Sequence, residues 1–160
     1  MKKILTLAFF IENNKILLGY KKRGFGSNRW NGFGGKVEPY ETLEEGARRE
    51  VLEECGIIIQ AMEKRAIHEF SFEKNDDVLE VHTFWVTQWR GEPKETEEMK
   101  PKWFPCSEIP YSKMWPDDIL WLPQFLKGQY LRTKFHFGEE DTVLESQVEE
   151  VSKEEINYES

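Results

Sequence analysis

Three glutamates, Glu50, Glu53 and Glu54, stand at positions i, i+3 and i+4 of one segment. In a helix, with roughly 100° between successive residues, this spacing places all three carboxylates on one face. Like charges at this spacing repel one another and cost the helix free energy unless a cation lies nearby. Mg²⁺ takes oxygen ligands and is usually held by a few carboxylates together with substrate phosphates. The cluster therefore indicates a hard-cation site, and a solvated acidic helix face is the alternative.

A second group of chemically useful residues is basic and surrounds a glycine-rich stretch. Residues 1–36 hold eight cations against one acid, Glu12, and five glycines lie between positions 24 and 35. Basic side chains in such a loop are suited to contacting phosphate. We expect a phosphate-facing loop, and a solvated turn between two strands is the alternative. The cations beside the glycines are Lys21, Lys22, Arg23 and Arg29.

The helix that must carry the glutamates is delimited by its own sequence. Thr42 and Glu45 have the spacing of a capping box, which starts a helix, and Gly56 is suited to end it. Apolar residues recur every four positions between these two ends. A second helix is predicted to begin at Pro116, with Pro123 as a kink or an end.

Strands are predicted around these two helices. Their ranges are 4–11 and 15–20 around an Asn-Asn turn, a short strand near Phe33, then 57–72, 78–89, 102–106, and a hairpin of 130–137 and 142–151. We expect one mixed α/β domain over residues 1–151, followed by a flexible acidic tail at 152–160.

Composition narrows the class of protein. The 160 residues are 39% hydrophobic and include 11 Phe, 6 Trp and 5 Tyr, which excludes a mostly disordered chain. No apolar run approaches the roughly 20 residues of a membrane span, so no membrane partner is expected. Two cysteines and no secretory signal favour a reducing compartment, the cytoplasm or a mitochondrial or nuclear pool. The net charge is −8, and basic residues concentrate before residue 37, so a broad nucleic-acid surface is not expected.

The glutamates also belong to a longer pattern. Gly35, Glu41 and the run from Arg49 to Ile57, REVLEECGI, match the Nudix box at every specified position. By this resemblance the chain is identified as a member of the Nudix family. Further segments, 21–26, 29–37, 46–50 and 114–118, resemble the vertebrate-type 8-oxo-dGTP diphosphatases of that family.

The resemblance implies a fold, a reaction and a set of roles. The fold is the α/β Nudix fold, with mixed β-sheets packed between helices in an α/β/α sandwich. The reaction is Mg²⁺-dependent hydrolysis of oxidised purine nucleoside triphosphates to the monophosphate and pyrophosphate, with Mn²⁺ as a substitute ion. The implied metal ligands are the Gly35 carbonyl, Glu50, Glu53, Glu54 and Glu98. Glu54, a candidate base, acts with Glu53 and Glu98 as the catalytic carboxylates, while Arg49 and Glu41 give structural support.

Base recognition is assigned to Trp115, Asp117 and Asp118. An aromatic face stacks on any base, and two close carboxyls in a dry pocket can share one proton. The protonated carboxyl then donates to a purine O6 while the ionised one accepts from N1–H and N2–H₂. The alternative is that both aspartates only cap a helix. The resemblance adds Thr6, Lys21, Phe25, Asn31, Phe70 and Trp121 to the substrate site, with Lys21 at the phosphates.

Two rival functions share most of these residues. One is a Nudix pyrophosphatase for a methylated purine triphosphate, a dinucleoside polyphosphate or ADP-ribose, which differs only in the base pocket. The other is a catalytically dead Nudix module that binds nucleotides, although all box carboxylates are intact. We expect a monomer acting on a small-molecule nucleoside triphosphate. The ranking of purine substrates, the sugar preference, the phosphorus attacked, the number of metals and the identity of the base stay open.

Overall fold

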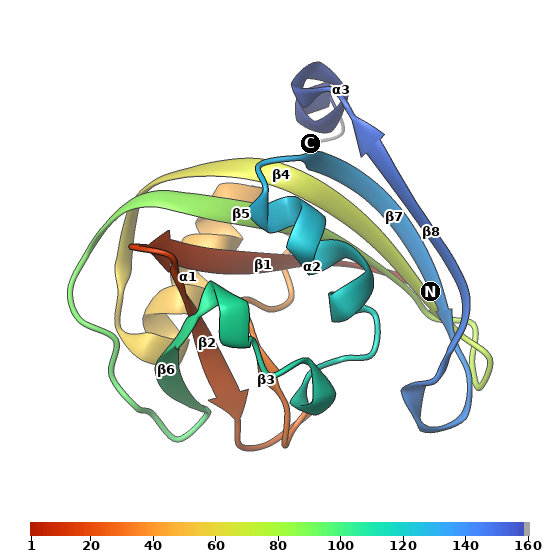
Figure 1. Cartoon of the computed structure of the whole chain (residues 1–160), viewed down its shortest axis with the longest axis horizontal. Helices are drawn as coiled ribbons and strands as arrows, with labels where there is room; N and C mark the ends of the chain where they lie inside the picture. Colours follow the sequence, from red (N-terminus) through yellow and green to blue (C-terminus); the bar gives the residue numbers. More distant parts are fainter. Residues whose placement is uncertain (159–160) are drawn as a thin grey trace.

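In the computed structural model, which describes residues 1–158, eight strands form one mixed sheet (Figure 1). The strand order is β3-β2-β1-β5-β4-β7-β8, and β6 pairs with β2. The β1–β5 and β4–β7 pairs are parallel, and the other pairs are antiparallel. The strands are β1 (Lys2–Glu12), β2 (Lys15–Lys21), β3 (Trp30–Asn31), β4 (Ile58–Phe72), β5 (Val78–Arg90), β6 (Met99–Pro105), β7 (Tyr130–Phe137) and β8 (Val143–Val151).

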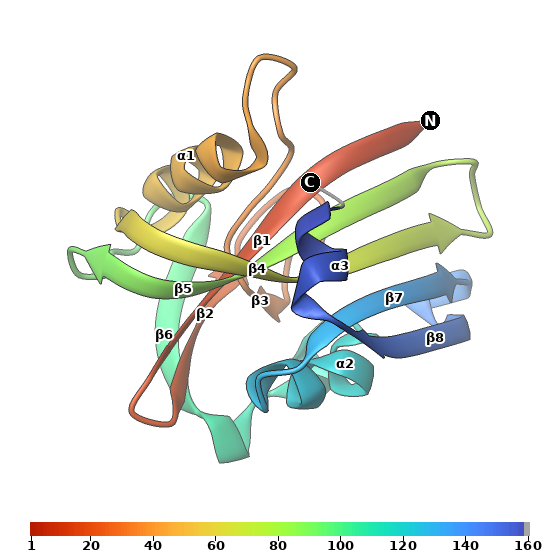
Figure 2. The same cartoon turned by 90° about the horizontal axis from the view of Figure 1, so that it is seen from above.

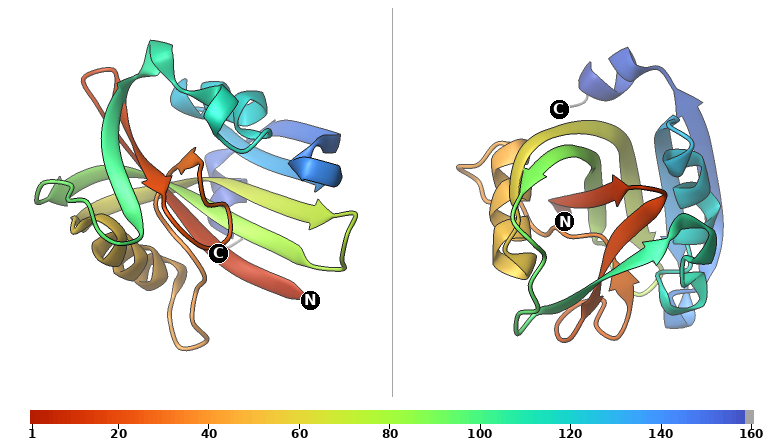
Figure 3. Two further views of the ribbon diagram at one scale, coloured as in Figure 1. Left: turned by 90° about the horizontal axis from the view of Figure 1, so that it is seen from below. Right: turned by 60° about the vertical axis from the view of Figure 1, so that its left-hand side comes forward.

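Two helices cover opposite faces of this sheet, α1 (Leu43–Cys55) and α2 (Asp118–Leu126) (Figures 2 and 3). β1 contributes side chains to both apolar layers, because successive side chains of a strand point to opposite faces of the sheet. Phe9 packs in the cluster with Trp121 of α2, whereas Phe10 packs in the cluster with Val51 of α1. The predicted layered α/β architecture is confirmed.

The start and end of α1 are those predicted. The Thr42 hydroxyl accepts from the Glu45 amide, and the Glu45 carboxylate accepts from the Thr42 amide, which completes the capping box. Gly56 ends the helix in the left-handed region at φ 77°. Elsewhere the bounds differ from expectation: β3 lies at Trp30–Asn31 while Phe33 forms only a bridge to Ala8, and α2 continues through Pro123.

The C-terminal segment differs most from the prediction. Where the sequence predicts a flexible acidic tail, residues Lys153–Tyr158 form a short helix, α3, that packs against β4 and β7. Ile156 is fully buried in this contact, and Lys153 pairs with Glu63 of β4 at 3.2 Å. One buried apolar residue and an ion pair therefore anchor a helix in which two of the six residues are acidic. Residues 159 and 160 of the predicted tail lie outside the described residues.

Both cysteines are free thiols. Cys55 lies in the last turn of α1, is fully buried against the sheet and has its Sγ 3.5 Å from the Val51 carbonyl. Cys106 is half-buried after β6. In the part of the chain that the structure describes, no helix is long and apolar enough to span a bilayer.

Candidate active site

The three glutamates of α1 have different surroundings although they share a helix face. Glu54 is buried, at 3% exposure, and accepts a hydrogen bond of 2.9 Å from the Gly34 amide. Glu50 is half-buried, whereas the side chain of Glu53 is about half exposed. A Cβ on Gly35 would lie 2.7 Å from the Glu50 carboxyl, so only glycine lets the loop approach this closely. The glutamate face of α1 is thus in direct contact with the glycine loop.

Arg49 holds this face in place. Its Nε donates to Glu41 at 2.6 Å, its Nη1 to Glu50 at 2.8 Å and its Nη2 to the Lys36 carbonyl at 3.0 Å. Its hydrogen bonds to Glu41, together with one from the Glu38 amide, lower the pKa of Glu41 to about 2. The predicted contact of Arg49 with Glu41 is therefore present, and Arg49 ties helix, loop and one candidate ligand together.

Burial dominates the electrostatics of the glutamates. It raises the pKa of Glu54 to about 8; the Gly34 amide opposes that rise, and the charge of Glu50 adds to it. Burial also raises the pKa of Glu50, against the hydrogen bond from Arg49. The charge of Glu98 also raises both pKa values. Ionising these crowded carboxyls together is costly unless a cation lies nearby, and without a cation they favour keeping a proton.

This donor set fits a hard cation without forming a closed cage. Among residues 1–158, no three His, Cys, Asp or Glu side chains already form a metal-holding group. The glycine loop instead meets two carboxyls, that of Glu54 at the Gly34 amide and that of Glu50 against Gly35. Mg²⁺ characteristically takes few protein ligands and completes its shell with water and substrate phosphate.

Thr96 connects Glu98 to α1, a role that the sequence analysis missed. Its hydroxyl donates to the Glu54 carbonyl at 2.9 Å and accepts from the amides of Glu98 and Met99, each at 3.2 Å. Threonine at one position of a polar loop carries no distinctive spacing, so only the tertiary contact identifies it.

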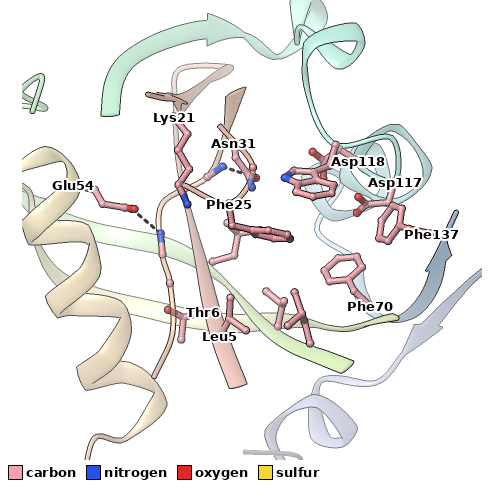
Figure 4. Close-up of a pocket in the computed structure, with 18 of the residues that line it drawn as sticks. Leu5, Thr6, Lys21, Phe25, Asn31, Glu54, Phe70, Asp117, Asp118 and Phe137 are labelled. Atoms are coloured by element: carbon pink, nitrogen blue, oxygen red, sulfur yellow. Dashed lines mark hydrogen bonds between the residues drawn. The ribbon is translucent and has the colours of Figure 1, made fainter. Parts of the chain in front are cut away.

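A cavity of about 140 Å³ runs from the α1 face to α2 (Figure 4). Figure 4 shows Glu54 on one side of the cavity and Asp117 and Asp118 on the other, with Phe25 between them. All nine residues predicted for the substrate site line this cavity: Thr6, Lys21, Phe25, Asn31, Phe70, Trp115, Asp117, Asp118 and Trp121. Apolar residues that were not predicted also line the cavity: Leu5, Leu7, Phe72, Leu79, Val81, Met99 and Phe137.

The two aspartates are buried carboxyls rather than helix caps. Asp117 is 2% exposed and Asp118 is 4% exposed, and Asp117 stands at the N-cap position of α2 without making a side-chain cap hydrogen bond. Asp117 instead accepts from the Trp121 indole at 2.8 Å, and Oδ2 of Asp118 has no partner among the described residues. Burial raises the pKa of both carboxyls, and the charge of Asp117 raises that of Asp118 further. The pair therefore favours holding a proton.

The basic residues near the glycines separate into two kinds. Lys21 lines the cavity, and its charge lowers the pKa of Glu54. Lys22 instead pairs with Glu95, and Arg23 lies 3.7 Å from Glu97. Arg29 pairs with Asp141. Of these four cations, Lys21 lines the cavity, while the other three pair with acids of other loops.

Comparison with known proteins agrees with this geometry. A family model described as the NUDIX domain matches residues 2–125. The "Oxidized purine nucleoside triphosphate hydrolase" of Danio rerio is 44% identical over 149 residues, covering 93% of this chain and 96% of that protein. The Mus musculus protein of the same name is 42% identical with the same coverage.

Among solved structures, the mutator MutT protein from Bacillus halodurans has a similar fold. The TM-score is 0.80 at 25% identity, covering 92% of this chain and 97% of that one. The box carboxylates on α1, the glycine loop against them and the family match over residues 2–125 together show that this chain belongs to the Nudix family of hydrolases.

Proposed function

We propose that this protein hydrolyses oxidised purine nucleoside triphosphates, of the 8-oxo-dGTP and 2-hydroxy-dATP type, to the nucleoside monophosphate and pyrophosphate. One observation carries the proposal: a single cavity is bordered by Glu54 and Lys21 at one end and by Trp115, Asp117 and Asp118 at the other. A purine nucleotide fits with its base at the aspartates and its phosphates at the glutamates. The names of the 44% and 42% identical relatives support this substrate class, whose removal sanitises the nucleotide pool.

At the phosphate end, Nudix hydrolases generally use a divalent cation, and we propose Mg²⁺, with Mn²⁺ as a substitute. When bound, the ion neutralises phosphate charge and lowers the pKa of the attacking water. The proposed ligands are the Gly35 carbonyl, Glu50, Glu53, Glu54 and Glu98. As the water oxygen bonds to phosphorus, the anhydride bond to pyrophosphate breaks, and the Glu54 carboxylate accepts the water proton. Glu53 and Glu98 complete the catalytic carboxylates, and Lys21 balances phosphate charge.

At the base end, the proposal relies on one shared proton. A protonated Asp118 or Asp117 donates to the O6 of an oxidised guanine, and its ionised neighbour accepts from N1–H and N2–H₂. Exchange of the two protonation states suits the edge of an oxidised adenine. Trp115 supplies stacking to either base, while Phe25 and Asn31 border the same space.

The proposed working unit is one domain, with α3 packed against its sheet, acting as a monomer in the cytoplasm or an organelle pool. The small-molecule triphosphate is its proposed partner, rather than nucleic acid or membrane. The continuous sheet from β1 to β8 supports one unit, because both ends of the cavity draw residues from it.

A kinetic panel tests the proposal. Product formation with Mg²⁺ is followed by chromatography for 8-oxo-dGTP, 2-hydroxy-dATP, O6-methyl-dGTP, dGTP, a dinucleoside tetraphosphate and ADP-ribose, because the last two substrates release no pyrophosphate. We expect the highest kcat/KM for an oxidised purine triphosphate. A higher kcat/KM for any other substrate contradicts the assignment, and tight binding without turnover identifies a nucleotide-binding module instead.

A further inference from the structure

Arg29 joins three segments of the chain at the base end of the cavity. Its guanidinium carbon lies 4.3 Å from the centroid of the Trp115 ring, and its Nη1 donates to Asp141 at 2.8 Å. Arg29 immediately precedes β3, Trp115 precedes α2, and Asp141 lies in the turn between β7 and β8. The three side chains therefore connect parts of the chain that no shared hairpin or helix holds together.

Arg29 is fixed at its backbone as well as at its side chain. Its carbonyl accepts from the Lys21 amide at 3.0 Å, and the next two residues pair with β2. Lys21, which is this hydrogen-bond partner, and Asn31, two residues after Arg29, both line the cavity. The guanidinium is thus anchored to the same backbone that presents two substrate-site residues.

The turn that presents Asp141 is conformationally unusual. Glu140 and Asp141 have φ angles of 54° and 59°, a left-handed conformation that costs free energy for residues with a side chain. Such strain persists where surrounding contacts determine it, and it often accompanies a functional role. Here it places a carboxylate against Arg29, and both side chains are only about one quarter exposed.

We propose that Arg29, held by Asp141, is a positioning residue that fixes the Trp115 indole for stacking against the purine base. The inference rests on the proposed function for its substrate. A cation stacked on one ring face restrains the indole, while Trp115 also lines the cavity where the base is proposed to lie. The alternative role for this arginine, contact with substrate phosphate, conflicts with its pairing to Asp141 and is an outcome of the test.

The molecule offers a matched control. Arg65 has the same pair of contacts away from the cavity: its guanidinium carbon lies 4.4 Å from the Trp85 centroid, and its Nε pairs with Glu63 at 2.6 Å. Neither Arg65 nor Trp85 lines the cavity. Loss of this cluster reports what removing such a contact does to the fold alone.

The experiment compares Arg29→Ala, Arg29→Lys, Asp141→Asn and the Arg29→Ala/Asp141→Asn double variant with Arg65→Ala. With 8-oxo-dGTP, we expect Arg29→Ala to raise KM about tenfold, the size of a lost, partly desolvated cation–π contact, with kcat unchanged. The inhibition constant of the product 8-oxo-dGMP should rise in parallel while that of pyrophosphate stays constant.

The double variant should match Arg29→Ala, because the two residues act through one contact. Arg29→Lys should recover part of the loss, and Arg65→Ala should leave KM unchanged.

A substrate-free measurement separates this inference from the proposed function. Acrylamide quenching of tryptophan emission should increase in Arg29→Ala and Asp141→Asn, and the increase should vanish in a Trp115→Phe background. Unchanged quenching overturns the inference whatever the substrate proves to be. A fall in kcat, or a rise in the inhibition constant of pyrophosphate, also overturns it and assigns Arg29 to the phosphates.

Discussion

The two ends of the cavity both bury carboxyl groups, but they are assembled in opposite ways. At the phosphate end, Glu50, Glu53 and Glu54 come from one stretch of α1. At the base end, Asp117 and Asp118 meet side chains from β1, β4 and the loop before β3. The first site is encoded by spacing along one helix, whereas the second depends on how the sheet brings distant segments together.

The two ends also resolve the same electrostatic problem differently. Burial raises the pKa of Glu54 and of both aspartates, so ionisation is costly at each end. The glutamates border an open face where a cation and Lys21 can compensate. The aspartates are buried, with Asp117 accepting a hydrogen bond from Trp121, and a proton retained by the pair compensates. One fold can therefore keep the proposed metal site and the proposed base-recognition site apart within a single cavity.

The largest expected effect tests the phosphate end. Glu54→Gln should lower kcat about 10²- to 10⁴-fold, because it removes a buried proton acceptor without changing its size. Pyrophosphate release with saturating Mg²⁺ measures the effect. Glu44→Gln, an exposed change in the first turn of the same helix, is the control. Near-wild-type turnover in Glu54→Gln removes this residue from the mechanism.

The next effect tests the base end. Asp117→Asn and Asp118→Asn should each lower kcat/KM for 8-oxo-dGTP about 10- to 100-fold, the usual result of leaving a buried hydrogen-bonding group unpaired. The ratio of kcat/KM for 8-oxo-dGTP and 2-hydroxy-dATP should change in both variants, since the proton can no longer move between two carboxyls. Asp76→Asn, in the exposed β4–β5 turn, is the control. An unchanged ratio in both variants rules out the shared proton.

A third prediction concerns stability and pH. Since burial raises the folded-state pKa of Asp118 above its unfolded value, the folded protein binds more protons and loses stability as pH rises above about 4. Asp118→Asn removes this loss, so its free energy of unfolding should exceed that of the wild type at pH 7 by about 1–3 kcal/mol. The difference should disappear at pH 3. Denaturant melts across this range check the sign, and parallel pH profiles for the two proteins contradict it.

The smallest effect tests Glu98, the proposed ligand that lies outside the Nudix box. Thr96→Val removes a hydroxyl that links Glu98 to the end of α1, so Glu98 should be less well placed. We expect about a fivefold higher Mn²⁺ dissociation constant by calorimetry, from the loss of about 1 kcal/mol per hydrogen bond. Thr96→Ser keeps the hydroxyl and should behave as wild type. An equal change in both variants points to packing rather than hydrogen bonding.

The features that could be predicted from the sequence are those set by neighbouring residues, as on α1, and those of the base end depend on distant segments. The bounds of α1 were predictable because Thr42, Glu45 and Gly56 act on backbone groups within one turn of themselves. The contact of Arg49 with Glu41 is similarly local. The lining residues of the base pocket were named through the family resemblance, and residue spacing alone could not have joined Thr6 to Trp121.

The remainder depended on tertiary contacts that leave no pattern. Phe72 and Phe137 enter the cavity because β4 and β7 pair in parallel with these two residues in register. α3 was missed because one buried residue, Ile156, gives no periodicity within an acidic segment. In both cases the decisive partner lies far along the chain.

The placement of Cys55 has a consequence for how this protein ages. Burial between α1 and the sheet raises the pKa of its thiol to about 12, and burial also raises the pKa of Cys106. Peroxide attacks the thiolate, so thiols kept protonated and covered enter the path to sulfenic acid slowly. Oxidised purines accumulate under the same peroxide load. The fold thus shields the Cys55 sulfur from the stress that generates the proposed substrates.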